Sequence, residues 1–358
     1  MKITSELLFN KIEKSIENNK PCVCYRAPKR SELRAFFQND RRVYKSKRLK
    51  ESGFIFAPFD FAQQNAIIIP ENKSEFNSAR FSARPIELGN FEDQNNTTLP
   101  LEKRTYKKLI DHCKRHIELT EIKKIVLSRR IAIETDPKDY LQTFQNLLNS
   151  RTNAMVYIWF HPKVGLWIGA TPETLLRVNG SSFETMSLAG TKAFDNKKKI
   201  EWTYKERREQ NYVTRFILEQ ISKKVNFVKT SRTRTVIAGN VAHRCTTIKG
   251  ILGSKTTLFS LVSYLHPTPA VCGLPQKSAK EFILANEGYD RKYYTGFLGE
   301  VNFMGISNLF VNLRCIELKN NVSYIYVGGG ITIESNSEDE WIETVEKSKV
   351  IKKALAVR

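Results

Sequence analysis

The sequence predicts an α+β fold with mostly antiparallel sheets and helices on the outside. Strand-like segments follow one another with short turns, most clearly over residues 154–188, instead of alternating with helices. Hairpin-like order of this kind gives antiparallel sheets. Amphipathic segments, beginning with residues 1–20, supply the helices. The chain shows no internal repeat and no clear linker, so we expect a single large domain over residues 1–358.

The elements of the first hundred residues can be assigned in order. Leu7, Leu8, Ile12 and Ile16 share one side of the predicted helix over 1–20. Strands are expected at 21–25, 53–59 and 66–70, and each of the last two has a proline at or next to its end. Residues 71–98 are polar and rich in Asn, Ser and Asp, so we expect a long loop or poorly ordered connection. This segment is also the only candidate domain boundary.

The rest of the chain continues the same mixture of elements. Helices are expected at 101–119, 139–149, 204–224, 256–265, 278–286 and 338–355. Strands are expected at 122–134, 154–160, 165–170, 175–178, 183–188, 234–240, 296–303, 308–318 and 322–327.

Composition limits the function classes. The formal charge of +21 suits a polyanion partner or a small anionic substrate. The densest basic segment, 41–50, is expected to be a solvated loop or helix face. No zinc-finger spacing, RNP sequence or G-x-x-G clamp in a helical context supports nucleic-acid binding, which therefore rests on charge alone. No apolar run approaches the ~20 residues that cross a bilayer, and the N-terminus lacks a signal-peptide pattern, so we expect a cytoplasmic protein.

Cysteine and histidine spacing gives little support for a redox or zinc site. Cys22 and Cys24 are the only closely spaced pair among six cysteines, which we expect to be reduced and partly buried. His112 and His116 stand at i,i+4 on a predicted helix, a spacing that suits a metal, but no second ligand cluster accompanies them.

The C-terminal stretch suggests a site for an anion together with a cation. Gly328, Gly329 and Gly330 follow a strand, and we expect a glycine turn whose backbone N–H groups a small anion could approach. Glu340 and Glu343 follow at i,i+3 on one helix face, where acidic residues also favour the helix dipole. The sequence therefore predicts anion-accepting amides beside a carboxylate pair.

A second carboxylate pair, Glu206 and Glu209, lies on another predicted helix. Because Lys and Arg flank these residues, an ion-paired surface explains them as well as a functional role does. Two such pairs on facing helices would form an oxygen-only site of the kind that Mg²⁺ takes.

Two further residues are candidates for proton transfer. Glu173 lies between two predicted strands, where it either begins a helical turn or acts as a general acid with a pKa raised by burial. Lys124 begins a strand in which it shares a face with Val126, so it is either an edge lysine or an inward-facing base. As a base it would need a pKa well below the ordinary lysine value of about 10.4.

Two more features suggest a cleft. The segment 266–273 combines a helix end, two prolines and a glycine, and loops of this kind often line sites. Arg314 is a charge inside the predicted strand 308–318, and buried arginines normally pair with a carboxylate, which can belong to a ligand.

Taken together, these motifs resemble the chorismate-utilising enzyme family, which includes isochorismate, salicylate, anthranilate and aminodeoxychorismate synthases. The resemblance covers residues 101–358, the expected catalytic core, and is thinner over residues 1–100, where 53–59 is the main match. It implies two stacked, mostly antiparallel sheets, helices outside and a deep cleft.

The resemblance also implies roles for individual residues. Glu209 and Glu343 resemble direct magnesium ligands, and Glu206 and Glu340 supporting carboxylates. Arg314 and Tyr294 resemble groups that hold one substrate carboxylate, and the amides of Gly328, Gly329 and Gly330 those that hold the other. His243 resembles a histidine of the substrate cleft, although Arg244 beside it departs from the expected leucine. Thr191 and Ala270 are further expected substrate contacts.

Two positions separate the subfamilies, and a third agrees with them. Enzymes that add water to chorismate resemble this chain at Lys124, where ammonia users tend to have glutamine. Aminodeoxychorismate synthase carries a nucleophilic lysine where this chain has Ala189. Ammonia users generally have threonine near Ala270. The resemblance thus implies an isochorismate synthase with Lys124 as base, Glu173 as acid and magnesium as cofactor. Salicylate synthase is the nearest alternative, followed by the two ammonia-using synthases.

We further expect a monomer that binds chorismate, with no membrane or nucleic-acid partner and no glutamine amidotransferase subunit or fused domain. The residues leave open whether the product enters menaquinone or siderophore synthesis.

Overall fold

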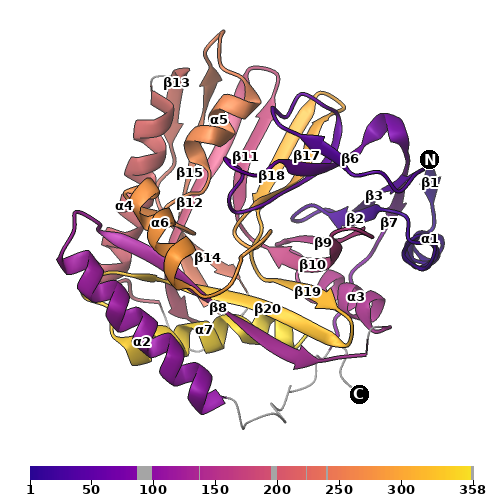
Figure 1. Ribbon diagram of the computed structural model, residues 1–358. Helices are drawn as coiled ribbons and strands as arrows, with labels where there is room; N and C mark the ends of the chain where they lie inside the picture. Colours follow the sequence, from indigo (N-terminus) through magenta and orange to yellow (C-terminus); the bar gives the residue numbers. More distant parts are fainter. Residues whose placement is uncertain (87–98, 137, 195–199, 223, 239–240, 356–358) are drawn as a thin grey trace.

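The computed structural model describes residues 1–86, 99–136, 138–194, 200–222, 224–238 and 241–355. Two large sheets form the centre of the molecule, with helices around them (Figure 1). All strand pairs in the described parts of the chain are antiparallel except β1 with β7. The predicted α+β class with two mostly antiparallel sheets is confirmed.

The strands fall into two sheets. In spatial order, the first sheet contains β1 (Lys2–Ile3), β7 (Ser74–Arg80), β3 (Glu32–Gln38), β2 (Cys22–Arg26), β9 (Met155–His161), β10 (Gly165–Thr171), β19 (Cys315–Lys319), β20 (Val322–Ile331), β8 (Lys124–Glu134) and β16 (Gly273–Leu274). The second contains β13 (Val225–Thr230), β15 (Val241–Leu252), β12 (Ser182–Ala193), β11 (Thr174–Asn179), β18 (Ile306–Val311), β17 (Phe297–Phe303), β5 (Gly53–Ala57), β6 (Ala66–Pro70) and β4 (Tyr44–Ser46), with β14 (Arg234–Ala238) also paired to β15.

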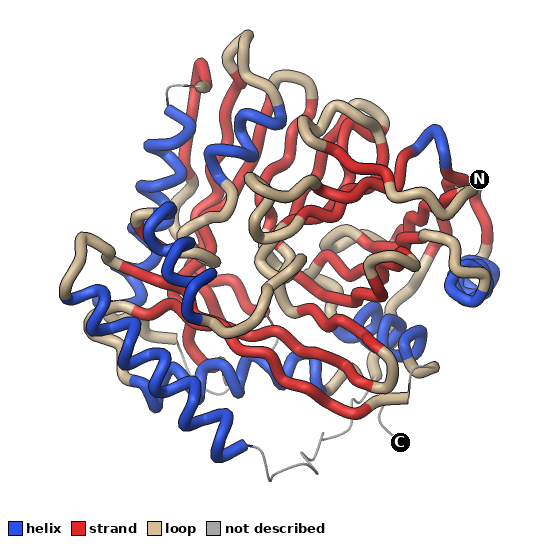
Figure 2. The backbone as a smooth tube through the Cα atoms, viewed as in Figure 1, coloured by secondary structure: helices blue, strands red, loops and turns tan. Residues whose placement is uncertain are grey.

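The helices lie outside the sheets, as Figure 2 shows. They are α1 (Ser5–Glu17), α2 (Leu99–Glu118), α3 (Tyr140–Ser150), α4 (Tyr204–Ser222), α5 (Leu258–Leu265), α6 (Gln276–Asn286) and α7 (Ser337–Lys352). No helix within the described residues combines the length and apolar character that crossing a membrane requires.

Alternating side chains explain why the sheets stack. In β2, Val23 and Tyr25 join an aromatic core that also contains Phe54 and Phe56 of β5, so this core lies between the two sheets. Cys22 and Cys24 point the other way, into a core shared with helices α1 and α3. Because both faces of β2 are covered, all five of its residues are buried. All six cysteines are free and buried, as expected from the sequence.

Three expectations about local structure were wrong. Residues 74–80, expected in a loop, form β7, because backbone pairing with β3 does not require an apolar pattern. Strands β3, β4, β13 and β15 were missed for the same reason, whereas the expected strand 234–240 corresponds to β14. The expected strand 308–318 is two strands, β18 and β19, which belong to different sheets. Residues 87–98 of the expected loop lie outside the described residues.

Candidate active site

A cavity opens where the chain passes from one sheet to the other. It encloses about 710 Å³ of empty space, including its open mouth. Of the residues singled out from the sequence, most lie in its wall: Glu173, Thr191, Glu209, His243, Ala270, Tyr294, Arg314, Gly328, Gly329, Gly330 and Glu343. Lys124, Glu206 and Glu340 are not part of the wall itself.

Two neighbouring crossings between the sheets position Glu173 and Arg314. Glu173 lies between β10 of the first sheet and β11 of the second, and Arg314 lies between β18 and β19. The crossings are tied together, because the Val311 N–H donates to the Glu173 carbonyl at 3.0 Å and the Ala170 N–H donates to the Arg314 carbonyl at 3.0 Å. A sequence that makes two sheets from continuous β-rich segments thus brings a carboxylic acid and a guanidinium cation close together.

Arg314 is therefore not inside a strand, contrary to the expectation. Its φ of 50° is incompatible with an extended strand and turns the chain towards the other sheet. Burial lowers the pKa of Arg314 to about 10. One of its guanidinium nitrogens donates to the backbone carbonyl of Lys347 at 3.3 Å, and Tyr294 lies in the same wall. The arrangement places a cationic group in the cavity wall, where it can pair with an anionic ligand.

The three glycines form part of strand β20 instead of the expected turn. Gly328, Gly329 and Gly330 pair with Ser128, Leu127 and Val126 of β8. On the other edge, pairing with β19 ends at Ile325. The Gly328 carbonyl accepts from Lys347 Nζ at 2.9 Å, so it points to this unpaired edge. Because N–H and C=O of a strand residue share an edge, the Gly328 and Gly330 amides face the same way.

Close packing, rather than a turn, explains why these positions are glycine. A Cβ at Gly330 would lie 2.6 Å from Lys124 Cε and 3.0 Å from Glu209 Oε1. A Cβ at Gly329 would lie 3.2 Å from Glu340 Oε2 and 3.5 Å from Glu343 Oε1. Three carboxylates thus flank the bare backbone of Gly329 and Gly330.

Lys124 is buried behind Gly330, with 1% of its surface exposed. Its Nζ lies 2.7 Å from Oε1 of Glu209, which projects from α4. The inward-facing alternative for Lys124 is therefore the one observed, and Val126, two residues along β8, lines the cavity.

Glu173 is buried, with 3% of its surface exposed. Burial raises the pKa of its carboxyl to about 8, against the opposing effect of the Lys124 charge. Glu173 is therefore protonated at neutral pH, which is the state of a general acid.

Glu206 has a different environment from Glu209. Its carboxylate accepts hydrogen bonds from the backbone N–H and the hydroxyl of Thr203, at 2.8 and 2.6 Å. This contact caps the start of α4. Glu206 lies one helical turn from Glu209, but the structure does not bring its carboxylate into the cavity wall.

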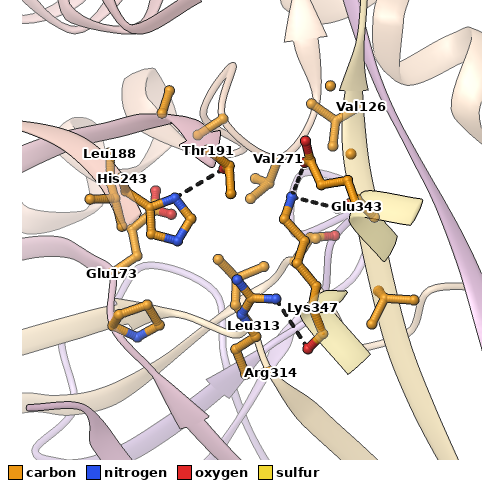
Figure 3. A pocket seen from close by; sticks show the side chains of 18 of the residues that line it. Val126, Glu173, Leu188, Thr191, His243, Val271, Leu313, Arg314, Glu343 and Lys347 are labelled. Atoms are coloured by element: carbon orange, nitrogen blue, oxygen red, sulfur yellow. Dashed lines mark hydrogen bonds and ion pairs between the residues drawn. The ribbon is translucent and has the colours of Figure 1, made fainter. Parts of the chain in front are cut away.

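The C-terminal helix brings a cation that the sequence reasoning missed. Lys347 contacts Glu343 at 2.6 Å across one turn of α7 and lines the cavity. In Figure 3, Glu343 and Lys347 lie on one side of the cavity and Glu173 and His243 on the other. The i,i+4 spacing of Glu343 and Lys347 was the available signal. Glu340, 2% exposed, accepts from the Ser335 hydroxyl at 2.7 Å.

His243 and Thr191 come from neighbouring strands β15 and β12. The Thr191 hydroxyl and His243 Nδ1 lie 3.0 Å apart, and Nε2 is buried without a hydrogen-bond partner. Burial, reinforced by the Arg314 and Lys347 charges, lowers the pKa of His243, so the ring is neutral. A neutral ring facing a cavity can donate to or accept from a ligand. Ala189, beside Thr191, also lines the wall.

Arg291 was not predicted as a site residue. Its side chain donates hydrogen bonds to three separate segments of the cavity wall. Its Nη1 donates to the Val271 carbonyl at 2.9 Å and the Thr295 hydroxyl at 3.2 Å, and its Nη2 donates to the Val126 carbonyl at 2.7 Å. Glu287 pairs with Arg291 and also accepts from the Ser128 N–H at 2.7 Å. Such a buried pair is detectable only once the backbone groups it contacts are known.

The carboxylates have the chemistry of a magnesium site. Glu209, Glu340 and Glu343 offer only oxygen donors, which Mg²⁺ prefers. Glu209 and Glu343 each contact a lysine, and no group of three or more His, Cys, Asp or Glu in the described residues has a metal-holding arrangement. His112 and His116 instead pack on the Phe282 ring, with ring centroids 5.4 and 4.8 Å away. The metal alternative for these histidines therefore gains no support.

Comparison with known proteins agrees with this geometry. Residues 59–356 match the family described as "Chorismate binding enzyme". The chain belongs to this family. It is 28% identical over 305 residues to isochorismate synthase EntC of Escherichia coli strain K12, covering 80% of this chain and 76% of that protein.

Two solved structures share the family fold. The menaquinone-specific isochorismate synthase MenF of Escherichia coli superposes with a TM-score of 0.78 at 20% identity, over 94% of this chain and 89% of that chain. Anthranilate synthase component I of Streptococcus pneumoniae gives 0.66 at 19% identity, over 84% and 80%. The fold of this chorismate-binding enzyme therefore matches MenF over more of this chain than it matches the anthranilate synthase component.

Proposed function

We propose that this chorismate-binding enzyme is an isochorismate synthase, which isomerises chorismate by adding water at C2 and releasing the C4 hydroxyl. The observation that carries the proposal is the buried Lys124 beside Glu209, at a position where ammonia-using relatives tend to have glutamine. Similarity to EntC, an isochorismate synthase, supports the same choice.

Lys124 and Glu173 divide the proton transfers. Lys124, in its neutral form, takes a proton from water as the oxygen bonds to C2. The two ring double bonds shift, and the C–O bond at C4 breaks. Glu173 gives its proton to the departing hydroxyl, which leaves as water. The raised pKa of Glu173, about 8, supports this role.

The two carboxylates of chorismate match two groups of donors in the wall. Arg314, Tyr294 and Lys347 hold one carboxylate, because cationic donors in a buried site bind carboxylates strongly. The unpaired edge at Gly328 and Gly330 offers backbone amides to the other.

Glu209 and Glu343 would hold Mg²⁺ directly, and Glu340 and Glu206 would support it. Bound magnesium would neutralise the ring carboxylate of the substrate and fix its position. Because Lys124 and Lys347 contact these two ligands, both lysine side chains must move when the cation binds.

Lys124→Gln tests the base assignment. Chromatography of reactions with chorismate and magnesium should show isochorismate formation lowered by about 10²- to 10⁴-fold, the usual contribution of a general base. Lys123→Gln is the matched control, because Lys123 is the exposed neighbour on the same segment. An unchanged rate in Lys124→Gln would exclude Lys124 as the base.

Product analysis tests the reaction itself. Salicylate and pyruvate as products would identify a salicylate synthase, and an aminated product with ammonium would identify an ammonia user. We expect isochorismate alone, formed at the same rate with or without glutamine and an amidotransferase.

We also propose one chorismate-binding domain, since residues 1–80 contribute strands to both sheets.

A further inference from the structure

A second cavity lies away from the candidate active site, beside the basic segment 41–50 and helix α5. Its walls come from the residues after β4, the loop between β5 and β6, and α5, which lie close together in Figure 1. It encloses about 1210 Å³ of empty space, including its mouth. It shares no lining residue with the candidate active site. We call it the cationic pocket.

Two cationic side chains border the cationic pocket without a partner. Lys47 and Arg48 line it, are exposed, and make no hydrogen bond or ion pair within the described residues. The third cation of the wall, Lys280, contacts Asp60 at 2.5 Å and is neutralised. Two unneutralised cations at one mouth attract an anion.

The floor of the cationic pocket is aromatic. Phe61 packs edge-on against Phe259, with ring centroids 6.2 Å apart, and both rings line the pocket. Gln64 and Ser263 add polar groups around this apolar surface. An apolar floor with a few polar groups is the usual composition of a small-molecule site.

His266 adds a third ring to the cationic pocket. It is 7% exposed, lines the pocket, and its Nε2 lies 3.1 Å from the Phe59 carbonyl. Burial lowers its pKa to about 4, so the ring is neutral and Nε2 donates to that carbonyl. Nδ1 is buried from the pocket as well as from solvent, so the ring of His266 adds contact surface and no hydrogen bond to a bound molecule.

We propose that the cationic pocket binds a small aromatic carboxylate. Lys47 and Arg48 hold the carboxylate, and Phe61 and Phe259 contact the ring. His266 also begins the segment 266–273, whose Ala270 and Val271 line the candidate active site. The two sites therefore share one loop. The inference does not depend on which reaction the enzyme catalyses.

Calorimetric titration with 4-hydroxybenzoate tests the proposal in an Arg314→Ala background, which weakens binding in the candidate active site. Binding of one molecule per chain is expected there. Lys47→Ser/Arg48→Ser should raise Kd by about tenfold or more, because it removes the charged donors. Acetate, which lacks a ring, should bind more weakly than the probe.

A matched double variant distinguishes binding in the cationic pocket from non-specific attraction to the positively charged surface. Lys45→Ser/Lys50→Ser removes two exposed cations from the same segment, and neither lines the pocket. It should leave Kd unchanged. The proposal is overturned by no binding in the Arg314→Ala background, or by equal weakening in both double variants. Since all four side chains are exposed, these variants should fold.

Discussion

Gly330→Ala provides a sharp test of the arrangement behind the glycine strand. The new Cβ would lie 2.6 Å from Lys124 Cε, 3.1 Å from Lys124 Nζ and 3.0 Å from Glu209 Oε1. Carbon atoms pack at about 3.5–4.0 Å, so the lysine must move by roughly 1 Å. Lys124 is buried, so this movement disturbs its 2.7 Å contact with Glu209.

The expected result is a large loss of activity with a smaller loss of stability. A displacement of about 1 Å in a catalytic group costs on the order of 10²-fold in rate, so kcat for isochorismate formation should fall about hundredfold. Overpacking should lower the free energy of unfolding by about 1–3 kcal/mol. Initial rates followed by chromatography give the first quantity, and denaturant titration gives the second.

Gly328→Ala separates the effect on Lys124 from damage to the strand. Its Cβ would meet the backbone oxygen of Leu127 at 2.5 Å, so the paired strand itself must shift. We expect a larger stability loss than for Gly330→Ala. In a Lys124→Ala background, Gly330→Ala should cost little further activity, because the alanine at position 124 lacks the Cε and Nζ atoms that would be displaced. Wild-type kcat in the single Gly330→Ala variant would refute the reasoning.

Three further predictions concern Glu173, Glu343 and Lys347. Because the pKa of Glu173 is raised to about 8, kcat/KM should fall as pH rises through about 8, and Glu173→Gln should lower kcat by about 10²- to 10⁴-fold. Protonated Glu173 contributes its full share of the unfolding free energy below the ordinary glutamate pKa of 4.5, and this share is lost as pH rises to about 8. The thermal stability of the wild type should therefore fall between these pH values. Thermal unfolding of Glu173→Gln should not show this part of the pH dependence. Glu343→Gln should raise the magnesium concentration for half-maximal rate by about tenfold or more, whereas Glu346→Gln on the same helix should not; equal effects would remove Glu343 from the metal site. Lys347→Met should raise KM for chorismate by about tenfold or more through loss of a charged donor, and an unchanged KM would exclude the contact.

Part of the candidate site could be predicted from residue spacing, whereas Tyr294, His243 and Thr191 were expected only from the resemblance to the chorismate-utilising family. The i,i+3 pairs fixed which glutamates share a helix face, since that spacing is local. Alternation along residues 124–128 correctly placed Lys124 and Val126 on one face. Helix α1 followed from apolar periodicity, and strands such as β2 and β9 followed from short apolar runs, which the structure buries on both faces.

Errors arose where long-range contacts decide the local conformation. The glycine run was expected to turn, because glycine permits turns, yet Gly328–Gly330 extend along β8 so that carboxylates and Lys124 can approach the backbone. Arg314 was expected within a strand, because the segment 308–318 is uniformly β-rich. Its positive φ and the change of sheet became visible only with both sheets in place.

The sequence alone determined the class of fold, most of the elements and the chemical groups available to the site, because periodicity and spacing act within a few residues. The tertiary structure decided which groups meet. It brings Gly329 and Gly330 close to the carboxylates of α4 and α7, and it places Lys347 in the cavity wall. It also directs the Glu206 carboxylate to the backbone N–H of Thr203, where it caps α4. It also gave Glu173 its raised pKa, because burial depends on segments that are distant in the chain.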